Sequence, residues 1–195
     1  MSPAADVSLG CRVKSGRAVA VLLAGPVGSP RLLDRREIDL CDPAVAASRQ
    51  PYHAAMGTLQ TDEAKVVRLR EIVAQAAQRS VADLMKAYRD AGHEVRSAGL
   101  VVGSEIDPAK ITNPHIRAHA LEGQLFRTVL EDALRSFHVS CSVLVERTVY
   151  AQAAGTLRRT EQELKSSVAQ LGRALGGPWR ADEKAASLAA WLALA

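Results

Sequence analysis

The stretch LGCRVKSGRAVAVLL, from Leu9 to Leu23, contains two apolar segments separated by Ser15 and Gly16. A two-residue link in which a glycine can adopt a positive φ is typical of a β-hairpin. We therefore expect strands over residues 7–14 and 17–25. After a second turn at PVGSP, residues 26–30, the segment RLLDRREIDLCD partly alternates apolar and charged residues, as a strand with one exposed face does. The chain is predicted to open with a three-stranded antiparallel meander.

Downstream of the meander, the patterns predict helices that alternate with strands. Residues 43–60 are expected to form a loop or a short helix, and Thr61 and Asp62 can cap a long helix over 63–91 that Gly92 ends. The segment GLVVG, 99–103, is a short and continuously apolar run, which is typical of a parallel strand buried on both faces. Asn113 and Pro114 predict the start of a helix that extends to about residue 137.

The C-terminal third is predicted to contain one more strand and two more helices. Residues 139–146, VSCSVLVE, fit a strand. A single amphipathic helix is expected next, ended by Gly176, with one apolar face formed by Leu157, Leu164, Val168, Leu171 and Leu175. The last helix is expected at about 179–195. Such an order predicts an α/β fold in which a mixed sheet has helices on both faces.

This order of elements resembles the ribonuclease H fold, which is shared by ribonuclease H, Holliday-junction resolvases and actin-like ATPases. The resemblance implies a single domain over residues 1–195. It also implies a metal-binding aspartate on the first strand, in a segment that reads approximately Leu-Gly-Ile-Asp-Pro-Gly-Ser in the resolvases. Here Arg12 stands at that position, after Leu9 and Gly10. A guanidinium repels Mg²⁺ and neutralises neighbouring acids, so the resemblance implies an incomplete catalytic motif.

Other acidic residues match the remaining catalytic positions of that superfamily. Glu105, just past the buried strand, and Asp182 or Glu183, early in the last helix, would meet the first strand at one metal site if the domain were active. Each has a simpler interpretation: Glu105 lies in a segment that reads as a solvated loop, and acids in a first helical turn complement the helix dipole. An ion pair between Arg12 and Glu105 could replace the lost metal. The phosphate-binding motifs of the ATPases are missing.

Two histidines and a glutamate occur at helical spacing in NPHIRAHALEGQLFR, residues 113–127. His115, His119 and Glu122 fall within an arc of about 60° on one helix face, which continues as an apolar stripe and is therefore expected to point inward. Their ligand types suit Zn²⁺, Fe²⁺ or Mn²⁺. The cofactor expected, if there is one, is a divalent ion: Mg²⁺, Mn²⁺ or Zn²⁺. The favoured explanation is simpler: they are partly buried side chains that hold the helix to the sheet edge through hydrogen bonds.

Basic residues near the C-terminus suggest a second candidate surface. A strip for nucleic-acid phosphates could be formed by Arg158, Arg159, Arg173 and Arg180, with Trp179 available to stack on a base. Interleaved glutamates favour an ordinary solvated surface instead. The alanine-rich last helix, with Leu188 and Trp191, is expected to pack in the core or, alternatively, to form a homodimer interface.

Composition narrows the function classes only slightly. The 195 residues are 48% hydrophobic and carry a net charge of +4, which permits anionic partners without requiring them. Three widely spaced cysteines indicate neither a disulfide framework nor a thiolate zinc site, and no apolar run reaches membrane-spanning length, so a cytoplasmic protein is predicted. We expect a non-catalytic, degenerate ribonuclease H-like module that binds nucleic acid or a protein partner. The alternative is a divergent metal-dependent hydrolase that uses the His-His-Glu cluster.

Overall fold

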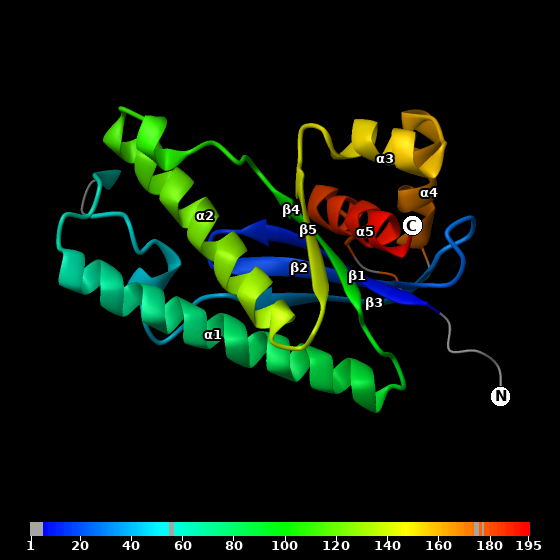
Figure 1. The fold of residues 1–195 in the computed structure, drawn as a ribbon, viewed down its shortest axis with the longest axis horizontal. Helices are drawn as coiled ribbons and strands as arrows, with labels where there is room; N and C mark the ends of the chain where they lie inside the picture. Colours follow the sequence, from blue (N-terminus) through cyan, green and yellow to red (C-terminus); the bar gives the residue numbers. More distant parts are fainter. Residues whose placement is uncertain (1–5, 55–56, 174–175, 177) are drawn as a thin grey trace.

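The computed structural model describes residues 6–54, 57–173, 176 and 178–195. It begins with the predicted meander of β1 (Val7–Lys14), β2 (Arg17–Ala24) and β3 (Arg31–Asp39), which pair antiparallel (Figure 1). Gly16, in the β1–β2 link, has a φ of 79°, a left-handed conformation that glycine adopts without steric cost. The hairpin therefore forms where the two-residue link predicts it.

The sheet continues through parallel strands. The helix α1 (Glu63–Asp90) leads to β4 (Ser97–Val102), and α2 (Pro114–Arg135) leads to β5 (Ser140–Val145), with short 3₁₀ turns at Ala46–Arg49 and Pro108–Lys110. The strand β4 pairs parallel with both β1 and β5, which gives the order β3-β2-β1-β4-β5. Asp62 and Asn113 cap α1 and α2 as expected, because their side chains accept hydrogen bonds from Lys65 N and Ile116 N.

Helices cover both faces of the sheet (Figure 1). Alternate residues of β2 belong to two separate apolar clusters: Ala18, Ala20 and Leu22 face α1 and α2, whereas Val19, Val21 and Leu23 face the C-terminal helices. Because successive side chains of a strand point to opposite faces, a strand covered on both sides must be apolar throughout. This explains the uninterrupted run AVAVLLA in β2.

The single amphipathic helix predicted before residue 176 is instead two helices, α3 (Val149–Leu157) and α4 (Glu161–Leu171). Arg158 ends α3 in a left-handed conformation, with a φ of 52°. Thr160 then caps α4 in a capping box: its side chain accepts a hydrogen bond from the backbone N–H of Glu163, and the Glu163 carboxylate accepts one from the backbone N–H of Thr160. Leu157 therefore lies on a different helix from Leu164 and Val168, and Leu175 is outside the described residues.

The last helix, α5 (Ala181–Leu194), packs directly on β1 and β4. Leu188 and Trp191 are buried in the core, as the first interpretation of this apolar helix expected. The close approach of α5 to the sheet requires Gly10 in β1 and Gly99 in β4. A Cβ added to Gly99, for example, would lie 2.6 Å from the carbonyl oxygen of Ala189. Among the described residues, no helix is both long and apolar enough to cross a membrane.

Candidate functional site

The carboxyl ends of β1, β4 and β5 meet at one edge of the sheet because these three strands are parallel. The helix α5 runs in the opposite direction: near its end, the carbonyl oxygen of Ala190 accepts a hydrogen bond from Ser8 at the start of β1. The first turn of α5 therefore lies at the edge where β1 ends, and it places Asp182 beside Arg12.

Arg12 is the centre of an ion-pair network at this edge. Its side chain is 5% exposed, and a guanidinium nitrogen lies 2.5 Å from the Glu146 carboxylate, just past β5. The same guanidinium donates to the carbonyl oxygens of Val13 at 2.8 Å and Val101 at 3.3 Å. Asp182 lies 3.9 Å from Arg12 and forms an ion pair with Lys14 at 3.1 Å. Arg12 thus lies between the carboxylates of Glu146 and Asp182, and Asp182 lies between Arg12 and Lys14.

The predicted acids are only partly brought together. Asp182 lies in the network, but Glu105 does not: its carboxylate pairs with Arg127 at 2.9 Å, so the alternative of an Arg12–Glu105 ion pair is wrong. Glu183 is buried, where it accepts from the backbone N–H of Arg180 and lies 3.9 Å from Arg35. Glu146, which the sequence analysis did not select, takes the place expected for Glu105. Its position at the C-terminal end of the predicted strand 139–146 was the available signal.

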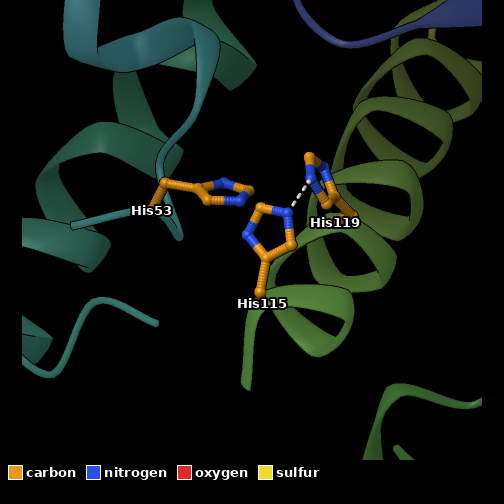
Figure 2. Close-up of side chains that lie close together, drawn as sticks. All are labelled: His53, His115 and His119. Atoms are coloured by element: carbon orange, nitrogen blue, oxygen red, sulfur yellow. Dashed lines mark hydrogen bonds between the residues drawn. The ribbon is translucent and has the colours of Figure 1, made fainter. Parts of the chain in front are cut away.

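Three histidines converge beside α2 (Figure 2). His115 and His119 come from the first two turns of α2, and His53 comes from the segment between β3 and α1. The ring centroids lie 4.4 to 5.3 Å apart. His115 and His119 are exposed, contrary to the expected inward orientation, whereas the side chain of His53 is only 8% exposed. Burial and the two neighbouring imidazoles lower the pKa of His119.

Glu122 lies behind the rings and is fully buried. Its Oε1 is 2.7 Å from His53 Nδ1 and accepts a longer hydrogen bond from the backbone N–H of Tyr52, at 3.4 Å. Its Oε2 is 3.8 Å from His119 Nδ1. Burial raises the pKa of the Glu122 carboxyl, and the hydrogen bond with His53 opposes that rise. The structure thus gathers the three predicted residues and adds His53, for which the sequence offered no local pattern.

Comparisons with known proteins identify the architecture. No protein-family model matches this chain, and no curated protein is similar to it in sequence. Among solved structures, Thermus thermophilus RuvC is similar over 96% of this chain and 92% of its own, with a TM-score of 0.56 and 10% identity. The T. thermophilus RuvC complex with a Holliday junction substrate gives a TM-score of 0.57 and 11% identity, over 95% and 90% of the two chains. The chain has a ribonuclease H-like fold.

A carboxylate metal centre does not fit this ribonuclease H-like domain at the edge where the resemblance places one. Magnesium ions need converging carboxylate oxygens, whereas here Glu146 and Asp182 are already paired with Arg12 and Lys14. A buried guanidinium among those oxygens would repel a divalent cation, as Arg12 in the sequence suggested.

The predicted basic strip is partly engaged in internal contacts. Arg159 donates to the carbonyl oxygen of Gly28 at 2.8 Å and lies over the ring of Trp191. The indole N–H of Trp179 donates to the carbonyl oxygen of Val168 at 2.7 Å, so this ring is held against α4. The remaining residues of the predicted strip are exposed: Arg158, Arg173 and Arg180.

Proposed function

We propose that this ribonuclease H-like domain binds nucleic acid without cleaving it. The observation that carries the proposal is the contact between Arg12 and Glu146 at the carboxyl ends of the strands. Hydrolysis assisted by two metal ions needs carboxylates that hold the ions against the scissile phosphate. The two acids of the Arg12 network, Glu146 and Asp182, are neutralised by cations of the same chain, so they are not free to act as the metal ligands that this reaction needs.

Binding is supported by the similar solved structure and by charge. T. thermophilus RuvC, similar over 95% of this chain, was solved with a Holliday junction substrate. The net charge of +4 favours anionic partners, and exposed Arg147 follows Glu146 directly at the edge. The exposed cations Arg158 and Arg173 lie further along the chain. Phosphate contacts from such side chains give affinity that depends on salt and not on sequence.

A cleavage assay tests the catalytic half of the proposal. The purified domain is incubated with four-way-junction and duplex DNA in Mg²⁺ and, separately, in Mn²⁺. We expect uncut substrate in both ions. Metal-dependent cleavage that disappears in Asp182→Asn would contradict the proposal, because it would show that the carboxylates act despite Arg12.

A titration of labelled junction DNA at several salt concentrations tests the binding half. We expect the affinity to fall steeply as the salt concentration rises. In a plot of the logarithm of the binding constant against the logarithm of the salt concentration, each phosphate contact that a variant loses should reduce the slope by about one. Arg147→Glu should weaken binding, whereas Arg68→Glu, the same charge change on the exposed face of α1, should not. Equal effects of both variants, or no binding at low salt, would count against nucleic acid and favour a protein partner. A cytoplasmic location stays a prediction.

A further inference from the structure

The histidine cluster of His53, His115 and His119 has the geometry of a metal site, and this inference does not depend on nucleic-acid binding. One ring nitrogen from each histidine lies within 4.8 Å of the others. The Nε2 atoms of His115 and His119 are 3.2 Å apart. Two nitrogens bound to one tetrahedral Zn²⁺ at about 2.0–2.1 Å lie about 3.3 Å from each other. The two residues of α2 are therefore already spaced as ligands of one ion.

Hydrogen bonds on the outer side fix the tautomer of two rings. His115 Nδ1 lies 2.7 Å from the carbonyl oxygen of Gly57. A carbonyl oxygen can only accept, so Nδ1 carries the proton and Nε2 of the neutral ring has a lone pair. His53 Nδ1 likewise faces the Glu122 carboxylate at 2.7 Å. In both rings the nitrogen with the lone pair is Nε2, as metal ligation requires.

His53 gives the independent indication that a ligand belongs here. Its side chain is 8% exposed, and its buried Nε2 has no hydrogen-bond partner among the described residues. Buried polar atoms are rarely left unpaired because desolvation is costly. Figure 2 shows the His53 ring directed toward the other two. A cation between the three rings would satisfy this nitrogen.

Glu122 acts from behind the ring of His53. A carboxylate that accepts the other N–H of a ligating histidine orients that ring and increases its basicity. Glu122 is fully buried, and its Oε2 also has no hydrogen-bond partner among the described residues. A divalent ion beyond the imidazoles would partly compensate this buried negative charge. Glu122 is thus placed as a support for the ligands, and not as the ligand that its helical spacing predicted.

We infer that His53, His115 and His119 bind one Zn²⁺-class transition-metal ion through their Nε2 atoms, with Glu122 positioning His53. Three imidazoles favour Zn²⁺ and related borderline ions over Mg²⁺ or Ca²⁺, which prefer oxygen ligands. Exposure of His115 and His119 leaves the fourth position to water. His119 also lines a cavity of about 210 Å³ that reaches Arg12 and Lys14.

Titration of the chelator-treated protein, residues 1–195, with Zn²⁺ tests this inference, by calorimetry in competition with a weak chelator. We expect one ion per chain. The exposed His119→Ala should reduce affinity more strongly than the about 10- to 100-fold loss expected for Glu122→Gln. His93→Ala, outside the cluster, is the matched control and should bind as the wild type does.

Two further readouts separate ligation from folding. Cobalt(II) in the wild type should give the visible absorption of a tetrahedral site with nitrogen ligands, and His53→Ala should lose it. Circular dichroism of each metal-free variant checks that the fold is kept, and Zn²⁺ should raise Tm only where the three histidines are intact. Substoichiometric binding, or equal affinity in folded His119→Ala and wild type, would overturn the inference. None of these readouts requires DNA.

Discussion

The guanidinium of Arg12 lies 2.5 Å from the carboxylate of Glu146, although 134 positions separate the two residues in the chain. This ion pair joins the end of β1 to the residue that follows β5, across the end of β4. Arg12 also donates to two backbone carbonyls at the same edge. It therefore holds together three strand ends as well as neutralising an acid.

Arg12→Ala should destabilise the domain by about 3 kcal/mol, because a buried cation, its hydrogen bonds and its packing are lost together. Glu146→Gln should cost about 1–3 kcal/mol, since part of the guanidinium loses its charged partner. Urea denaturation measures both. Arg17→Ala is the control: its pair with Glu37 is exposed, and its loss should cost less than about 1 kcal/mol. Equal losses in Arg12→Ala and Arg17→Ala would show that the edge network contributes little.

Gly99→Ala should destabilise the fold by about 1–3 kcal/mol, because the added methyl group would press on the backbone of α5 at Ala189. Gly155→Ala provides the opposite case. Gly155 is in α3, and nothing lies within 4 Å of its added Cβ, so alanine should stabilise the helix by about 1 kcal/mol. Thermal unfolding of both variants checks the opposite signs. A tolerated Gly99→Ala would mean that α5 can move away from the sheet.

Cys141 should react slowly with iodoacetamide at pH 8. Desolvation, with a contribution from Glu131, raises the pKa of its thiol to about 11. At pH 8 such a thiol carries roughly 100-fold less thiolate than one at the ordinary pKa of 9.0. Cys11 is fully buried, and burial raises its pKa further, so it should stay unmodified until the protein unfolds. Timed mass spectrometry of labelled peptides checks both sites, with the urea-unfolded chain as the reference. Labelling of native Cys141 at the unfolded rate would contradict the prediction.

Asn113→Ala should destabilise the domain by about 1 kcal/mol, because the side chain of Asn113 accepts the hydrogen bond of Ile116 N at the start of α2. Asn113→Ser should restore most of the loss, since serine is also a good N-cap residue. The neighbouring Thr112→Ala serves as the control for a change at an exposed position outside the helix. Hydrogen exchange in the first turn of α2 should accelerate only in Asn113→Ala. An unchanged rate there would show that tertiary contacts alone hold this turn.

Local patterns predicted most of the fold, because each signal involved residues close together in sequence. The Ser15-Gly16 link predicted the hairpin, and Asn113 predicted the start of α2. The break at Arg158 was missed, since an arginine in a left-handed conformation has no sequence signature, although Thr160 and Glu163 have the spacing of a capping box.

The candidate sites were less predictable because they depend on contacts between distant segments. His115, His119 and Glu122 were grouped correctly by helical spacing, but their exposure and their separate roles depend on how α2 packs. His53 approaches them from a segment with no regular periodicity. Glu146 meets Arg12 only because β5 adds to the sheet next to β4. Spacing identified the neighbours on one helix and could not identify partners from other elements.

The network around Arg12 gives this edge of the sheet an internal counterion. A site built from carboxylates alone changes its charge as magnesium enters or leaves, and so it responds to the ionic composition of its surroundings. Arg12 and Lys14 are covalently part of the chain and cannot dissociate from Glu146 and Asp182 in that way. The charge balance of these two carboxylates is therefore set by the amino-acid sequence, without a magnesium ion as their counterion.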